Sequence, residues 1–216
     1  MSPLWGRVDP EVHRSLERSF QLGFLGSMPI DEQIEHALGF VAIVEEKLGR
    51  EPTSVIDLGT GGGVPGLILV SCWPDATIVL MDASERRTVF LQESLESWPR
   101  AGRAEVVRGR AEELGRKGEL REQFEVVTSR SFGIPGLTAE CGSAFLAPGG
   151  WMVISEPPNA DSGERWPRDG LAAVGMEPDE TVRPSVRFGY QVLKKVLRID
   201  ERFPRRVGIP AKRPIF

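Results

Sequence analysis

The stretch that decides the fold is residues 55–66, which read VIDLGTGGGVPG. A short apolar run leads into a turn with glycine at positions 59, 61 and 63, and a helix-favouring segment follows. Glycine lets such a turn adopt positive φ angles and lets the backbone approach a ligand closely. Because ligands of open α/β sheets bind beyond the carboxyl ends of the strands, this stretch predicts a strand, a ligand-binding turn and a helix.

The spacing of these glycines separates two classes of ligand. A dinucleotide-binding turn follows GxGxxG and needs its third glycine where this chain has Val64. The pattern here is GxGxG, which argues against a hydride-transferring dehydrogenase. The alternative that the glycines serve only close packing is disfavoured by the strand and helix predicted on either side.

Acidic residues at the ends of the neighbouring runs fit a nucleoside-like ligand. Asp82 follows the glycines by about 20 residues, where a carboxylate accepts hydrogen bonds from ribose hydroxyls. Taken alone, an aspartate there is more often a helix N-cap, but its pairing with the glycine turn reverses that preference. Asp57 is expected to receive the amides of the turn or an ammonium group of the ligand. Backbone groups of Gly109–Glu113 are expected at an adenine edge, although the two glutamates there also suit the first turn of a helix.

Outward from the glycine turn, short β-branched runs alternate with longer amphipathic ones. Strands are predicted at 54–58, 77–81, 104–107, 125–129 and 151–155, and helices near 65–71, 84–98, 112–122 and 135–146. This alternation predicts a doubly wound, mainly parallel α/β sheet with helices on both faces. Strand-like runs at 181–183 and 190–197 predict an antiparallel end to the sheet.

The chain is expected to form a single domain in three parts, since 216 residues suffice for one full core but not for two. Residues 1–50 are an N-terminal helical segment whose first helix ends near Gly26 and whose second begins after Pro29. Residues 52–200 are the core, and residues 201–216 are a basic, extended tail. Within the core, residues 160–168 are expected to form a mobile loop that lies over the site.

Composition excludes several classes of function. The formal net charge of −4 is not that of a protein that binds nucleic acid with its whole surface, so any such binding needs a local patch. Cys72 and Cys141 stand far apart without partners at metal-ligand spacing, which predicts two buried thiols and no metal site. No apolar run approaches membrane-spanning length and the N-terminus lacks secretory features, so the expected location is the cytoplasm.

Positive charge gathers near the C-terminus, where two interpretations stay open. The residues are Lys194, Lys195, Arg198, Arg202, Arg205, Arg206, Lys212 and Arg213. They form either a patch for the phosphates of a nucleic acid or an ordinary solvated tail, and charge alone does not decide between the two.

These segments together resemble the glucose-inhibited division protein B family, bacterial 16S rRNA guanine-N7 methyltransferases. The resemblance rests on DLGTGGGVPG at 57–66, DAS at 82–84, RAEE at 110–113, VTSRSF at 127–132, PGG at 148–150 and FPRRVGIPAKRP at 203–214. The GVPG extension of the turn and the PRR of the ending are more specific to the family than GxGxG. The similarity runs from about Pro52 to the C-terminus and is weaker in the N-terminal helices.

The resemblance implies a Rossmann-like class I methyltransferase that uses S-adenosylmethionine, with 16S rRNA or the small ribosomal subunit as its partner. It implies that Arg130 lies where cofactor and RNA meet, as the catalytic and substrate-side residue, unless this arginine only pairs with a carboxylate. Arg130 is the implied RNA contact, and the positive charge of the tail adds Arg205, Arg206 and Lys212 as expected RNA contacts. The implied cofactor contacts are Asp57, Gly59, Thr60, Gly61, Gly63, Asp82, Ala83, Ala111, Glu112 and Arg130.

One departure from the family keeps other functions open. The family usually carries a Lys-Gly pair after the fifth strand, whereas this chain has Ser155 and Glu156, so a carboxylate replaces a cation. A methyltransferase for a small molecule or another RNA position, with Glu156 as general base, is therefore the main alternative. A non-catalytic nucleotide-binding protein that keeps the fold is the third.

Overall fold

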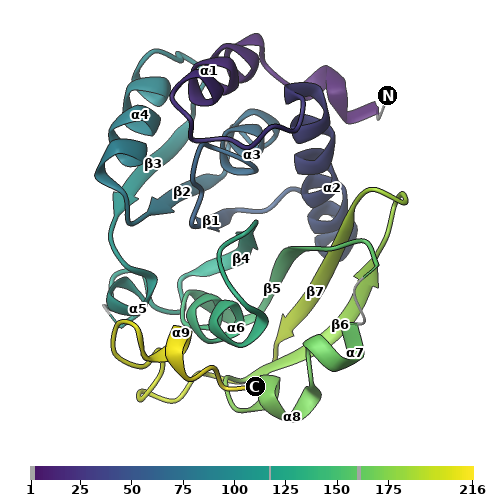
Figure 1. The fold of residues 1–216 in the computed structure, drawn as a ribbon, viewed down its shortest axis with the longest axis vertical. Helices are drawn as coiled ribbons and strands as arrows, with labels where there is room; N and C mark the ends of the chain where they lie inside the picture. The colour runs from purple at the N-terminus through teal and green to yellow at the C-terminus, as the bar shows by residue number, and fades with distance from the viewer. Residues whose placement is uncertain (1–2, 117, 160–161) are drawn as a thin grey trace. The chain divides into compact units, whose positions relative to one another are not determined.

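The computed structural model describes residues 3–116, 118–159 and 162–216. The chain forms two compact units, Met1–Arg108 and Gly109–Phe216. Figure 1 shows the helices and strands of each unit. The single domain expected from the sequence stays a prediction.

The first unit begins with the predicted helices. A short 3-10 helix, Pro3–Arg7, precedes α1 (Pro10–Gln21), whose N-cap Asp9 accepts a hydrogen bond from the backbone of Glu11 at 2.9 Å. The helix α1 ends before the predicted Gly26, because Leu22 caps it and Gly23 turns the chain with a φ of 72°. The helix α2 (Ile30–Leu48) follows Pro29 and ends at Gly49 in the left-handed conformation, a common way to end a helix.

The sheet of the first unit is parallel, with the order β3-β2-β1. Its strands are β1 (Ser54–Leu58), β2 (Thr77–Asp82) and β3 (Arg103–Arg108), and its connecting helices are α3 (Gly66–Cys72) and α4 (Glu85–Glu96). The apolar residues of β1 and α3 are almost wholly buried, as expected of a strand and a helix inside an α/β core. The predicted order of strand, turn and helix around residues 55–66 is confirmed.

The sheet of the second unit has the order β4-β5-β7-β6, and its far end is antiparallel as predicted. Its strands are β4 (Phe124–Ser129), β5 (Leu146–Glu156), β6 (Met176–Val182) and β7 (Gly189–Lys195). Its helices are α5 (Ala111–Leu114), α6 (Pro135–Ser143), α7 (Ser162–Arg165), α8 (Arg168–Ala172) and α9 (Ile209–Lys212).

Three local predictions were wrong in part. The helix expected at 112–122 is only the four residues of α5, because Glu122 takes a φ of 53° and its amide bonds to the carbonyl of Ala144. The tail is not extended throughout, since Phe203 is buried and α9 follows Gly208. Of the loop expected at 160–168, residues 160–161 lie outside the described residues, and α7 and α8 occupy much of the remainder.

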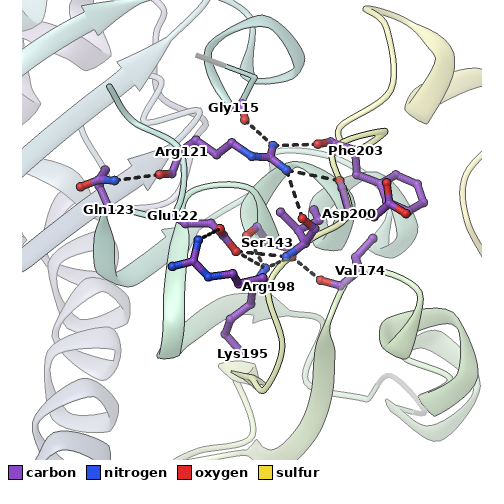
Figure 2. A network of polar contacts seen from close by, with 11 residues as sticks. Gly115, Arg121, Glu122, Gln123, Ser143, Val174, Lys195, Arg198, Asp200 and Phe203 are labelled. Carbon is purple, nitrogen blue, oxygen red and sulfur yellow. Dashed lines mark hydrogen bonds and ion pairs between the residues drawn. The ribbon is translucent and has the colours of Figure 1, made fainter. Parts of the chain in front are cut away.

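A lysine at the end of β7 lies fully inside the second unit (Figure 2). The Nζ atom of Lys195 donates to the carbonyl oxygen of Ser143 at 2.8 Å and to its Oγ at 2.7 Å, and lies 3.8 Å from Oε1 of Glu122. Burial lowers the pKa of Lys195 to about 8 from its ordinary 10.5, and Glu122 offsets only part of this. Lys195 therefore adds nothing to the basic surface to which the sequence assigned it.

Within the described ranges, no helix is long and apolar enough to cross a bilayer. The same residues contain no group of three or more His, Cys, Asp or Glu side chains arranged to hold a metal ion.

Candidate cofactor site and basic tail

The glycine turn joins the end of β1 to α3 within the first unit. Gly59, Gly61 and Gly63 all have positive φ angles, of 69°, 59° and 98°. The amide of Thr60 donates to the carbonyl of Met81 at 2.9 Å, which fixes the turn against the end of β2. The conformational freedom that the sequence assigned to these glycines is therefore used.

The glycines of this stretch have two different tasks. A Cβ atom at Gly62 would collide with Oγ of Ser19 and lie 2.9 Å from the carbonyl oxygen of Phe24. A Cβ atom at Gly66 would lie 2.5 Å from Oγ1 of Thr60 and 2.8 Å from Oδ2 of Asp57. At Gly61 the nearest atom would be 3.8 Å away. Gly62 and Gly66 thus serve packing, whereas the space beside Gly61 is open.

Asp82 ties the turn to the start of α4. Its Oδ2 accepts a hydrogen bond from the amide of Gly61 at 3.0 Å, and its Oδ1 accepts one from the amide of Ser84 at 2.8 Å. The helix N-cap is Ser84, so Asp82 is not a cap itself. An ionised carboxylate has about four acceptor sites, so Asp82 can still accept bonds from ligand hydroxyls.

The turn fits an adenosine-type cofactor in its polar chemistry. Asp57 is fully buried at the end of β1, with its carboxylate beside Gly66. The Oγ1 atom of Thr60 is also buried and has no hydrogen-bond partner among the described residues. A buried hydroxyl without a partner costs about 1–3 kcal/mol, and a bound ligand or water is the usual way to recover it. Ala83, the next predicted contact, is exposed.

The other predicted cofactor residues belong to the second unit. Ala111 and Glu112 are buried at the start of α5, and Oε1 of Glu112 accepts a hydrogen bond from the amide of Gly208 at 3.1 Å. Arg130 is half-buried and follows β4 directly, ahead of Ser131 with its φ of 56°. Their common placement with the glycine turn in one site stays a prediction.

Of the predicted RNA contacts in the tail, Arg205 differs from the others. Its guanidinium forms a bidentate pair with Glu140, a fully buried residue of α6, with Nη2 at 2.6 Å from Oε2 and Nε at 3.0 Å from Oε1. This hydrogen-bonded pairing raises the pKa of Arg205. Arg206 and Lys212 are exposed and have no acidic partner among the described residues. Sequence reasoning missed Glu140, and the one signal is a carboxylate in an otherwise uncharged helix.

Glu156, the alternative general base, is also engaged. It ends β5, its side chain is only 4% exposed, and both oxygens accept bonds from Arg165, at 2.6 Å from Nε and 3.2 Å from Nη2. The pairing raises the pKa of Arg165. To accept a proton from a substrate, Glu156 would first have to give up this bidentate pair, so the geometry disfavours it as a base.

Comparison with solved structures defines the class of protein. A putative O-methyltransferase from Klebsiella pneumoniae aligns with a TM-score of 0.57 at 13% identity, covering 88% of this chain and 91% of its own. A 16S rRNA adenine-N1 methyltransferase from Catenulisporales acidiphilia aligns at 0.56 and 16% identity, covering 74% and 92%. With the glycine turn and Asp82, these likenesses define a Rossmann-like class I methyltransferase fold.

Sequence comparison identifies the family within this class. The family model described as rRNA small subunit methyltransferase G matches residues 27–157. A protein of that name from Leuconostoc mesenteroides is 32% identical over 81% of this chain and 74% of its own length, and one from Thermotoga neapolitana is 33% identical over 75% and 71%. The chain belongs to the rRNA small subunit methyltransferase G family, as its motifs predicted.

Proposed function

We propose that this protein transfers a methyl group from S-adenosylmethionine to N7 of a guanine in 16S rRNA. The observation that carries the proposal is the glycine turn, with room beside Gly61 and with Asp82 bonded to it, in a member of the rRNA small subunit methyltransferase G family. Relatives 32% and 33% identical to this chain bear that name, and a solved structural neighbour was determined with its cosubstrate SAM.

The cofactor, when bound, supplies a methyl group on a positively charged sulfur. The backbone of Gly59, Gly61 and Gly63 would let it approach the end of β1, and Asp82 would accept bonds from its ribose hydroxyls. Asp57 and Thr60 would offer polar groups beneath the turn. Ala83 beside Asp82, and Ala111 with Glu112 in the second unit, complete the proposed contacts.

Methyl transfer to guanine N7 requires the protein to position the two reactants but not to transfer a proton. N7 of guanine has an outward lone pair and carries no proton, so no base must act before the methyl group moves. The protein must hold the nucleophile in line with the leaving sulfur, a task of proximity and orientation. Arg130 is the residue proposed to contact both cofactor and RNA. This account agrees with the engagement of Glu156 by Arg165.

The basic tail is proposed to contact the phosphates of the RNA. The chain is acidic overall, with a formal net charge of −4, so attraction to a polyanion requires local positive charge. Arg206 and Lys212 are exposed cations of this tail. The guanidinium of Arg205 donates hydrogen bonds to the carboxylate of Glu140 and to the carbonyl oxygen of Arg213.

One alternative keeps a specific observation in its favour. Ser155 and Glu156 stand where the family usually has Lys-Gly, so the cation that would attract phosphate there is missing. A small molecule or a different RNA position is therefore the second candidate substrate, with Glu156 as base after release from Arg165.

Binding and transfer together test the proposal. Calorimetry should show binding of S-adenosylmethionine and S-adenosylhomocysteine but not of NAD. Radiolabelled methyl groups should then pass to deproteinised small-subunit rRNA, to assembled small subunits, or to both. Cofactor binding with no transfer to either RNA would favour the small-molecule alternative, and no cofactor binding at all would favour a non-catalytic protein.

A further inference from the structure

The side chain of one arginine holds the start of the tail by hydrogen bonds to backbone carbonyl groups (Figure 2). The guanidinium of Arg121 donates to the carbonyl oxygens of Gly115 at 2.9 Å and Phe203 at 2.8 Å, and to those of Ile199 and Asp200 at 3.3 and 3.2 Å. Five N–H donors in a planar fork suit such a cluster of carbonyls. The chain therefore enters the tail (residues 201–216) along a fixed course.

Two buried carboxylates hold the middle of the tail. Glu140 on α6 is fully buried and accepts hydrogen bonds from the backbone amide of Arg205 at 2.7 Å and from its guanidinium. Glu112 on α5 is 8% exposed and accepts from the amide of Gly208 at 3.1 Å. A buried carboxylate without partners is costly, so both residues favour the tail in this one conformation.

Arg205 also closes the tail on itself. Its Nη2 donates to the carbonyl oxygen of Arg213, the C-cap residue of α9, at 2.7 Å. A single guanidinium therefore connects α6, the middle of the tail and the C-terminal end of α9. Arg205 thus already uses Nε and Nη2 within the protein.

Three cations of the same tail face solvent. Arg206, Lys212 and Arg213 are exposed and form no ion pair in the part of the chain that the structure describes. Arg198 and Arg202 differ, because they lie 3.6 Å from carboxylate oxygens of Glu122 and Asp200. The free positive charge of the tail therefore lies on the loop that Arg205 closes.

We propose that Glu140 and Arg205 are positioning residues, which fix the tail so that Arg206, Lys212 and Arg213 form one phosphate-binding patch. This inference rests on the proposed function, because the phosphates are those of the rRNA. It changes the role that the sequence assigned to Arg205, from a phosphate ligand to an anchor, and keeps Arg206, Lys212 and Arg213 as the phosphate contacts.

The physical advantage of an anchor is preorganisation. A free tail would lose conformational entropy when it binds RNA, because each backbone residue that becomes fixed gives up its freedom. A tail that folding has already fixed does not lose that entropy again on binding. The anchor therefore strengthens RNA binding although Glu140 carries a negative charge.

The two roles of Arg205 predict opposite signs for one substitution. If Arg205 binds phosphate, Glu140 competes with the RNA for it, and Glu140→Gln should tighten binding. If Arg205 is an anchor, the neutral amide loses the charge-assisted bidentate pair, the tail loosens, and binding should weaken. We expect roughly tenfold weaker binding of deproteinised 16S rRNA, about 1.4 kcal/mol.

The experiment measures the dissociation constant of deproteinised 16S rRNA by filter binding over a series of salt concentrations. Glu140→Gln should weaken binding and flatten the salt dependence, because fewer phosphates are contacted. The matched control is Glu201→Gln, an exposed carboxylate of the same tail without an ion pair in the described chain, which should tighten binding slightly. Equal or tighter binding by Glu140→Gln would overturn the proposal.

A second variant covers the case that Glu140→Gln does not fold, which circular dichroism would show. Arg205→Lys keeps the charge and loses the bidentate fork. An anchor predicts weaker binding and a raised KM for rRNA with an unchanged single-turnover rate at saturating RNA, whereas near-native binding would contradict it. If the wild-type protein binds S-adenosylmethionine but neither deproteinised 16S rRNA nor assembled small subunits, the proposed function itself fails, and this inference fails with it.

Discussion

Replacing Asp82 by asparagine tests the cofactor site most sharply. The carboxylate accepts hydrogen bonds from the amides of Gly61 and Ser84, at 3.0 and 2.8 Å, and is proposed to accept hydrogen bonds from the ribose hydroxyls of the cofactor as well. Asparagine has one acceptor oxygen, so it can keep the hydrogen bond from Gly61 or the one from Ser84 but not both. It also lacks the negative charge that strengthens each of these bonds.

The expected loss follows from these contacts. Hydrogen bonds to a charged group contribute about 1.5–3 kcal/mol, so losing the ribose bonds should weaken binding of S-adenosylhomocysteine by roughly 10- to 150-fold. Isothermal titration calorimetry at constant pH measures this directly. The control is Asp75→Asn, an exposed aspartate before β2 with no side-chain bond in the described structure. Unchanged affinity in a folded Asp82→Asn protein would remove Asp82 from the site.

Three further predictions concern packing, pH and the alternative base. Gly62→Ala should lower the free energy of unfolding by about 1–3 kcal/mol, because its Cβ meets the carbonyl of Phe24, and it should leave cofactor binding by the folded protein largely intact. Gly61→Ala should also lower stability, because a φ of 59° strains an alanine, and it should in addition impair cofactor binding, so calorimetry distinguishes the two variants. The pKa of Lys195, lowered to about 8 from 10.5, lies below its unfolded value, so the unfolded state binds more protons and stability rises with pH above 8. Burial raises the pKa of Cys72 to about 12 from 9.0 and that of Cys141 well above 9.0, so both thiols oppose this gain as the pH approaches and passes 9. The wild-type protein should therefore gain about 1 kcal/mol relative to Lys195→Met between pH 8 and 9 in urea titrations. Glu156→Gln should leave the single-turnover methylation rate within about twofold, and a loss of roughly 10²- to 10⁴-fold would instead identify Glu156 as a general base.

Local sequence patterns were enough to predict the order of helices and strands in the first unit. The limits of β1 follow from its apolar run and the glycine turn, and the bounds Ser54–Leu58 agree with the prediction. Asp82 was proposed as a cofactor residue because a carboxylate about 20 residues after such a turn has a known task in nucleotide-binding sheets. Its bond to Gly61 supports that reasoning.

Contacts between residues distant in sequence were the ones that could not be predicted. The pairing of Arg205 with Glu140 joins residues 65 apart in sequence, and no local pattern announces it. The helix α5 is short because Glu122 and Gly115 meet Ala144, a contact that depends on the placement of α6. Amphipathic spacing at 112–122 suggested a full helix, and tertiary packing overrode it.

Contacts between residues distant in sequence also decide which of the charges near the C-terminus are available for binding. Their number is evident from the sequence, but Lys195 is buried, Arg198 and Arg202 have acidic partners, and Arg205 is an ion-paired residue. Only the burial of these side chains and their ion pairs in the structure show which cations are available to bind a polyanion.

The measurement that most directly tests the central claim is identification of the methylated atom. The purified protein is incubated with S-adenosylmethionine and with small-subunit rRNA, deproteinised in one reaction and assembled in the other, and the nucleosides and fragments of the product are mapped by mass spectrometry. We expect 7-methylguanosine at a single guanine. Methylation at an oxygen or an exocyclic amine, or of neither RNA by a protein that binds the cofactor, would contradict it.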